Sequence, residues 1–226
     1  MGKRTVAALA QIDQSRTYGV SEAVELLTKL ASAKFDESLE VHLRLGIDPK
    51  KGDQLVRGTV TLPHGTGKTV RVAVFASESL QAVAKEAGAD LVGGEDLIAD
   101  IKKSEKTDFD VAVATPDMMP KMGPIAKILG TRGLMPNPKN DTVTNDVKRI
   151  ITELKKGKVT FKNDDTANLH LAVGKVSFGK DKLAENVIAL LDAVQKIKPR
   201  TAKGTYMKTI ALTTTMGPSI RVSATL

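Results

Sequence analysis

Residues 206–222, YMKTIALTTTMGPSIRV, alternate in the manner of a β-strand that is interrupted once. One face would carry Tyr206, Lys208, Ile210, Leu212 and Thr214, and the other Met207, Thr209, Ala211, Thr213 and Thr215. Residues 216–219 break the ladder, because Pro218 has no N–H to donate and Gly217 lets another backbone approach closely. Two interpretations stay open, a simple hairpin turn or a surface of hydroxyls and a thioether for a flat, polar partner.

Length and composition indicate a globular protein of one large domain or two small ones. The chain has 226 residues, is 41% hydrophobic and contains no cysteine. Disulfides and thiolate metal sites are therefore excluded, and a reducing compartment is expected. No run of about 20 apolar residues occurs, so the sequence predicts a soluble, cytoplasmic protein without a membrane partner.

The sequence predicts neither a metal site nor a cofactor. Its three histidines, His42, His64 and His170, are far apart, so a metal site would need carboxylates from distant segments. Residues 63–69, PHGTGKT, end like a phosphate-binding P-loop, but the position where its first glycine belongs is Leu62, and a strand follows instead of a helix. The Gly-x-Gly-x-x-Gly fingerprint of dinucleotide sites is also missing after the first strand of the segment that follows.

The charge favours a polyanionic partner. Lysine and arginine number 34 against 26 acidic residues, which gives a net charge of +8 and a pI of about 9.5. Aromatic residues make up only 3% and tryptophan is absent, so a base-stacking platform is not expected. A nucleic acid would instead be recognised through phosphates, shape and 2′-hydroxyls.

The two ends of the chain share one pattern of strands and helices. Alternation predicts a strand at residues 39–45 and a second at 56–62, arranged as a hairpin-like pair. A weak helix is expected over residues 3–14. Ser21 and Asp181 are expected to cap two amphipathic helices, the second of which stops before Pro199.

The middle of the chain alternates strands and helices. Strands are predicted at residues 70–76, 89–92 and 109–114, and helices at 79–87, 95–103 and 144–156. The predicted fold class is thus α/β with two domains: a composite α+β domain built from residues 1–65 plus 159–226, and an inserted three-layer Rossmann-like domain of residues 66–158. The insert carries 15 basic and 13 acidic side chains and the flanking segments 19 and 13, so the composite domain holds most of the excess charge.

The loop at residues 115–139 follows the last strand of the insert, where ligand sites gather in open α/β sheets. Its methionines, Met118, Met119, Met122 and Met135, fit either an exposed protein-binding surface or a cap packed over the sheet. An enzyme using this loop for a phosphorylated substrate is the main rival class. Apart from Asp117, however, the loop has no group that would serve as base, nucleophile or metal ligand, so no catalytic residue is predicted.

Several motifs are spread in order along nearly the whole chain: AKFDE at residues 33–37, RGTVTLPHG at 57–65, ILG through PNPK at 128–139, VGK at 173–175 and TTTMGPSIR at 213–221. Together they resemble the bacterial ribosomal protein L-one family, the stalk proteins of the large ribosomal subunit. The resemblance implies a non-enzymatic protein of two hinged domains, monomeric when free, that binds large-subunit rRNA mainly through the composite domain. It also implies contact with deacylated tRNA at the exit site and repression of translation through the protein's own operon mRNA.

The family's RNA contacts, carried over to matching positions, define a predicted patch. It comprises Lys34, Phe35, Glu40, Thr213, Thr215, Met216, Gly217, Ser219 and Arg221, with Arg132 and Lys139 as secondary RNA contacts. Hydroxyls would meet 2′-OH groups and lysine would meet phosphate, although Phe35 could equally be a core residue and Lys34 merely solvated. Thr215→Val is expected to leave folding nearly intact and to weaken RNA binding by roughly 1–3 kcal/mol.

Overall fold

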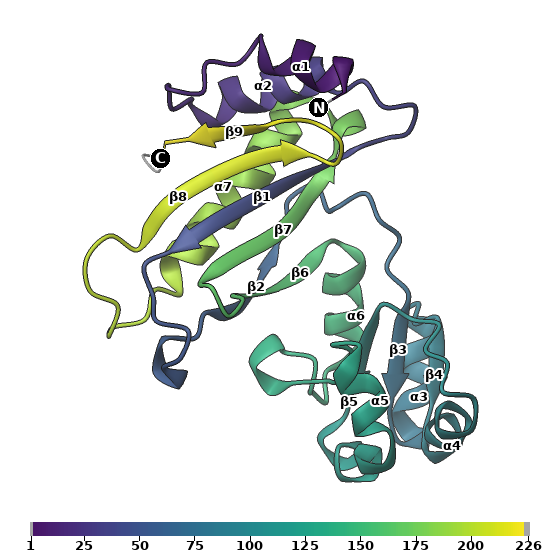
Figure 1. Cartoon of the computed structure of the whole chain (residues 1–226). Coiled ribbons are helices and arrows are strands. Elements are labelled where there is room, and N and C mark those ends of the chain that lie inside the picture. The colour runs from purple at the N-terminus through teal and green to yellow at the C-terminus, as the bar shows by residue number, and fades with distance from the viewer. Residues whose placement is uncertain (1, 224–226) are drawn as a thin grey trace. The chain divides into compact units, whose positions relative to one another are not determined.

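A computed structural model describes residues 2–223, which form two compact units (Figure 1). The first unit combines both ends of the chain, up to Gly67 and again from Gly157 onward, and the second unit is Lys68–Lys156. Helices and strands occur in both units, which confirms the predicted α/β class.

The first unit is built on a four-stranded antiparallel sheet in the order β7-β1-β8-β9. Helices α2 and α7 pack on one face of the sheet through a shared apolar core, and the other face stays open (Figure 1). Alternation explains this split, since every second residue of β1 from Leu39 to Leu45 is buried and the intervening side chains are not. The elements are α2 (Val20–Leu30), β1 (Ser38–Leu45), β7 (Asn168–Lys175), α7 (Lys180–Lys196), β8 (Met207–Thr214) and β9 (Ser219–Val222).

The expected hairpin between the first two strands is wrong. Strand β2 (Arg57–Thr61) pairs instead with β6 (Lys158–Lys162) in a separate two-stranded antiparallel sheet. Both edges of β1 are already occupied, by β7 and β8, so β2 has no free edge of β1 to join. The partner of β2 follows the inserted unit, about a hundred residues later in the chain.

The predicted helix starts are also corrected. Helix α1 (Lys3–Leu9) is shorter than expected. Helix α2 begins after Gly19 rather than at Ser21, and α7 begins after Gly179, whose φ of 83° requires glycine. Asp181 therefore lies inside the first turn of α7, where its charge favours the helix dipole without capping it.

The second unit is a three-layer α/β structure around a parallel sheet in the order β4-β3-β5. Alternate residues of the central strand point to opposite layers, so that Val72 and Val74 pack toward α3 and α6, whereas Ala73 and Phe75 pack toward α4 and α5. The elements are β3 (Val72–Phe75), α3 (Glu78–Glu86), β4 (Leu91–Gly93), α4 (Glu95–Ser104), β5 (Val111–Ala114), α5 (Ala126–Thr131) and α6 (Val147–Lys155).

The methionines of the loop after β5 pack over the sheet instead of forming an exposed surface. Met118 and Met122 are buried in the apolar cluster between the sheet and α4, and Met119 and Met135 pack against it half-buried. Short 3₁₀ helices at Pro116–Met118 and Pro120–Ile125 fold the loop back onto the strand. Of the two interpretations of this loop, the packed cap is therefore the correct one.

Candidate nucleic-acid interface

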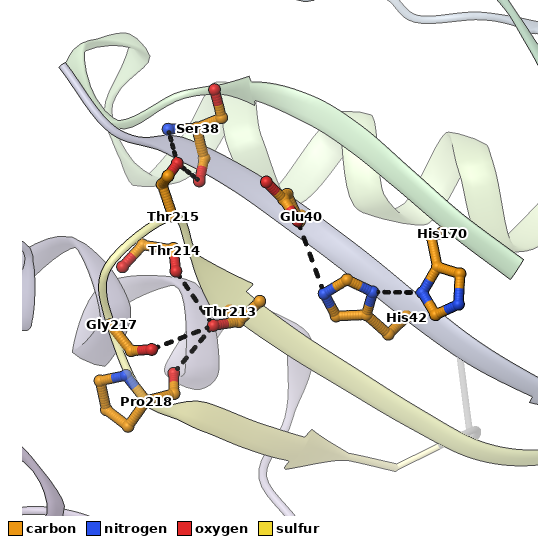
Figure 2. A network of polar contacts seen from close by, with 9 residues as sticks. All are labelled: Ser38, Glu40, His42, His170, Thr213, Thr214, Thr215, Gly217 and Pro218. Carbon is orange, nitrogen blue, oxygen red and sulfur yellow. Dashed lines mark hydrogen bonds and ion pairs between the residues drawn. The ribbon is translucent and has the colours of Figure 1, made fainter. Parts of the chain in front are cut away.

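The break in residues 206–222 is a hairpin turn between β8 and β9. The strands pair with Thr213 opposite Ser219, and the Gly217 N–H donates to the Thr214 carbonyl at 3.0 Å. The Thr213 hydroxyl points into the turn, within 3.1–3.3 Å of the carbonyls of Thr214, Gly217 and Pro218 (Figure 2). An added Cβ at Gly217 would overlap the buried Thr214 hydroxyl, so this turn requires a residue without a side chain.

The Thr215 hydroxyl extends the pairing of β1 with β8 beyond the last strand residue. It accepts a hydrogen bond from the Ser38 N–H at 3.0 Å and lies 3.4 Å from the Ser38 carbonyl (Figure 2). The Thr215 N–H donates to the same carbonyl at 3.1 Å. Because this hydroxyl is engaged with the backbone, it stabilises the start of the hairpin turn and is not simply a free ligand for RNA.

Glu37 is a buried carboxylate that joins the turn to the segment before β1. Its side-chain oxygens accept the Met216 N–H at 3.0 Å and the Ala33 N–H at 3.1 Å, and only 3% of the residue is exposed. Burial alone would raise the pKa of Glu37, but these donors outweigh it and hold the pKa below its usual value. Glu37 therefore stays charged and fixes residues 33–37 against the hairpin. Glu37 was not among the predicted site residues, although an acidic pair, Asp36 and Glu37, directly before an alternating apolar strand was a visible signal.

Lys34 and Phe35 are displayed on the segment that Glu37 anchors. Phe35 is 55% exposed, so it is not a core residue, and Lys34 is exposed as well. Met216, on the turn at the other end of the Glu37 contact, is 53% exposed. Two large apolar side chains thus stand in solvent on two segments that one carboxylate holds together, which is typical of a binding surface.

A second polar cluster holds the same segment from the side of β7. The Asp36 carboxylate accepts the Ser177 N–H at 3.1 Å and its hydroxyl at 2.7 Å. Lys175 donates to the Ser38 hydroxyl at 2.8 Å and to the Asp36 carbonyl at 3.2 Å. These contacts fix the backbone on both sides of Glu37, so Lys34 and Phe35 are presented from a rigid base.

Strand register places the remaining residues of the predicted patch on the open face of the sheet. Glu40 lies opposite Thr213, and Thr213 lies opposite Ser219, so these three form one row across β1, β8 and β9. Arg221 belongs to the next row, opposite Ala211. Ser219 and Arg221 are exposed and Glu40 is half-buried. The structure therefore brings all nine predicted residues of the first unit to one end of the sheet and to the loops that border it.

The two secondary contacts lie in the other unit. Arg132 follows α5, where its guanidinium donates to the Thr107 hydroxyl and, at 3.1 Å, to the Glu105 carbonyl. Lys139 lies in the 3₁₀ helix Pro138–Asn140, which Asn137 caps by accepting the Lys139 N–H. Both residues are exposed, but only Arg132 is tethered through its side chain to a neighbouring loop.

Within residues 2–223 no group of three or more histidine, cysteine, aspartate or glutamate side chains is placed to hold a metal ion. Within the same residues no helix is both long and apolar enough to cross a bilayer.

Comparison with known proteins matches this chain along most of its length. The model of the ribosomal protein L1p/L10e family covers residues 27–218. The large ribosomal subunit protein uL1 of Chloroflexus aggregans is 54% identical over 98% of this chain and 94% of its own length. The proteins of the same name from Chloroflexus aurantiacus and Cutibacterium acnes are each 53% identical, over 98% and 96% of this chain and 94% and 93% of their own lengths.

These relatives are named as ribosomal proteins and not as enzymes. The family model includes the anchoring carboxylate Glu37, the strand β1 and the hairpin as far as Pro218. The chain belongs to the ribosomal protein L1p/L10e family.

Proposed function

We propose that this protein is a structural component of the large ribosomal subunit that binds rRNA through its first unit. One observation carries the proposal: the Glu37 carboxylate joins the segment of Lys34 and Phe35 to the β8–β9 hairpin, so that exposed apolar, hydroxyl and cationic groups share one rigid surface. The names of the relatives support the same assignment. Association with ribosomes in the cytoplasm follows from it.

The chemistry of the surface suits structured RNA. Phe35 and Met216 offer flat contact to an unstacked base or a ribose, and Lys34 and Arg221 offer charge to phosphates. Ser219 is exposed, so its hydroxyl can pair with a ribose 2′-OH. Because the hydroxyls of Thr213 and Thr215 hold the turn, their contribution is to shape the backbone around Gly217.

Finer roles extend this proposal. Residues 1–65 plus 159–226 would act as the principal RNA-binding domain, and residues 66–158 as an inserted domain that adds contacts through Arg132 and Lys139. The protein would be a monomer when free, would take part in release of deacylated tRNA from the exit site, and would repress translation by binding its own operon mRNA. No cofactor or catalytic step is needed for any of these roles.

The test is a salt titration of binding between the full chain and a fragment of large-subunit rRNA. Each lost phosphate contact should reduce the slope of log affinity against log salt by about one. Arg221→Gln is expected to do so, whereas Lys182→Gln on α7, which lies on the helix-covered side of the sheet, should leave the slope unchanged. A flat response of the unmodified protein, or equal slopes for both variants, would contradict the proposal.

Footprinting separates the finer roles from the main one. Protection of one rRNA element by the full chain is expected, with matching protection of a similarly folded element in the operon mRNA. Protection of rRNA alone would retain the ribosomal assignment and remove the repressor role. Arg132→Gln combined with Lys139→Gln should weaken only those contacts that the inserted domain makes.

A further inference from the structure

Two histidines that are 128 residues apart in the sequence meet on the open face of the sheet. His42 of β1 and His170 of β7 are directly opposite in the antiparallel pair. Their Nδ1 atoms are 2.7 Å apart (Figure 2). The expectation of no metal site assumed that the histidines stay far apart, and the strand register removes this assumption.

The 2.7 Å contact is a hydrogen bond, in which the Nδ1–H of one ring donates to the Nδ1 of the other. A metal ion bound by both nitrogens would replace the shared proton. Imidazole nitrogens bind Zn²⁺ at about 2.0–2.1 Å, so two such bonds place the nitrogens roughly 3.3 Å apart at a tetrahedral angle and about 2.9 Å apart at a right angle. The rings, which are tilted by 59° to each other, would rotate outward to reach this spacing. The strand backbones hold both rings beside each other, so little conformational entropy would be lost on binding.

The outer nitrogens of both rings face carboxylates, as in many metal sites. His42 Nε2 is 3.7 Å from Glu40, and His170 Nε2 is 3.7 Å from Asp164. The hydrogen bond between the rings needs one Nδ1–H, so a metal bound to both Nδ1 atoms would displace that proton. A carboxylate near Nε2 stabilises a proton on that nitrogen and so favours presentation of the Nδ1 lone pair to the metal.

The pair is also accessible from solvent. The side chains of His42 and His170 are 32% and 55% exposed. They line a shallow depression together with Arg44, Asn168 and Arg221, among other residues. The two arginines oppose a bare cation but favour one that carries anionic co-ligands, and the open side leaves room for such ligands or for water.

We infer that His42 and His170 form a two-imidazole site for a borderline divalent cation such as Cu²⁺ or Zn²⁺. These cations suit imidazole ligands, whereas Mg²⁺ and Ca²⁺ prefer oxygen. The inference concerns the protein alone and does not depend on the proposed binding of RNA. A cation there would lie on the same open face as the predicted patch, in the row next to Glu40 and Thr213.

Electron paramagnetic resonance of the full chain with less than one equivalent of Cu²⁺ tests the site, in the absence of RNA. The nitrogen modulation is expected to report two coordinated imidazoles in the unmodified protein and one in either His42→Ala or His170→Ala. His64→Ala is the matched control, because the third histidine contacts Glu185 elsewhere in the same unit. This variant should retain the two-imidazole signal.

Titration calorimetry with Zn²⁺ gives an independent measurement. We expect about one equivalent to bind, with at least a tenfold loss of affinity in each of the two single variants and no loss in His64→Ala. His170→Gln keeps a polar side chain on the strand and serves as a second test if His170→Ala does not fold. Circular dichroism checks that both variants are folded. Absence of binding, or equal binding by His42→Ala and the unmodified protein, would overturn the inference.

Discussion

Replacing Glu37 by alanine tests whether one buried carboxylate holds the candidate interface together. The substitution removes the acceptor for two backbone N–H groups, those of Met216 and Ala33, at 3.0 and 3.1 Å. It also detaches the segment that carries Lys34 and Phe35 from the β8–β9 turn. Both the free energy of unfolding and the affinity for rRNA should fall.

The magnitude follows from the two hydrogen bonds. A hydrogen bond to a charged group contributes roughly 1.5–3 kcal/mol, so the full loss would be about 3–6 kcal/mol. Met216 is exposed and Ala33 is half-buried, so water can accept hydrogen bonds from N–H groups that lose the carboxylate as their acceptor. The lower end of the range therefore applies, and we expect unfolding to become easier by about 3 kcal/mol.

Tyrosine fluorescence in a urea titration reports the unfolding of the first structural unit, which contains Glu37. The chain has two tyrosines, Tyr18 and Tyr206, both in the core of the first unit, and it has no tryptophan. Glu40→Ala is the matched control, because it removes the same charge three residues further along the chain, at a half-buried position whose ion-pair partner His42 is 3.7 Å away. Its effect should stay within about 0.5–1 kcal/mol. Equal destabilisation by Glu37→Ala and Glu40→Ala would refute the reasoning.

The same carboxylate makes stability depend on pH. Because the pKa of Glu37 is lower in the folded protein than its ordinary value of 4.5, its contribution is complete above that value and is lost as the pH falls through the folded pKa. Glu37→Gln cannot titrate, so its unfolding free energy should change less than that of the unmodified protein below about pH 4.5. An unchanged pH profile would contradict the assignment.

Three further substitutions probe the β8–β9 hairpin and the turn before β7. Gly217→Ala forces a Cβ against a buried hydroxyl and should destabilise the first unit by roughly 1–3 kcal/mol in urea titration. Thr215→Val removes the hydroxyl contacts to the Ser38 backbone and should cost about 1 kcal/mol of stability, measured in the same way, in addition to any loss of RNA affinity in filter binding. The pKa of the Asp164 carboxylate is lowered to about 2, chiefly by the hydrogen bond from the Asn168 N–H. Its stabilising effect should therefore be lost as the pH falls from about 4 toward about 2. In Asp164→Asn the melting temperature should depend less on pH over that range.

Each of these substitutions has a control nearby. Gly52→Ala, in the same unit, adds a Cβ with no atom within 4 Å, Thr209→Val changes an exposed threonine of β8, and Asp165→Asn removes the adjacent exposed charge. All three should leave stability and its pH dependence almost unchanged. Equal effects in a test variant and its control would argue against the corresponding contact.

The alternation of residues 39–45 and 206–222 was enough to predict the strands and their buried faces, because side-chain period alone determines which face is apolar. The same pattern could not distinguish a simple hairpin turn from a binding surface around Gly217, and the structure shows a hairpin there. Helix starts were less predictable. The helices begin after Gly19 and Gly179, neither of which has a side chain to cap them, and of these two Gly179 has the positive φ that favours glycine. Ser21 and Asp181, two positions later in each case, were therefore mistaken for caps.

The sequence by itself determined the α/β class, the apolar faces of the strands and the family to which the chain is similar, since these depend on local period and on motifs. Only the tertiary structure decided that β2 pairs with β6, that Glu37 binds the turn 179 residues away, and that His42 meets His170. These contacts depend on strand order and register, and a shift of one residue would turn each side chain to the other face of the sheet. No local pattern carries that information, because it arises when segments from opposite ends of the chain pack around one core.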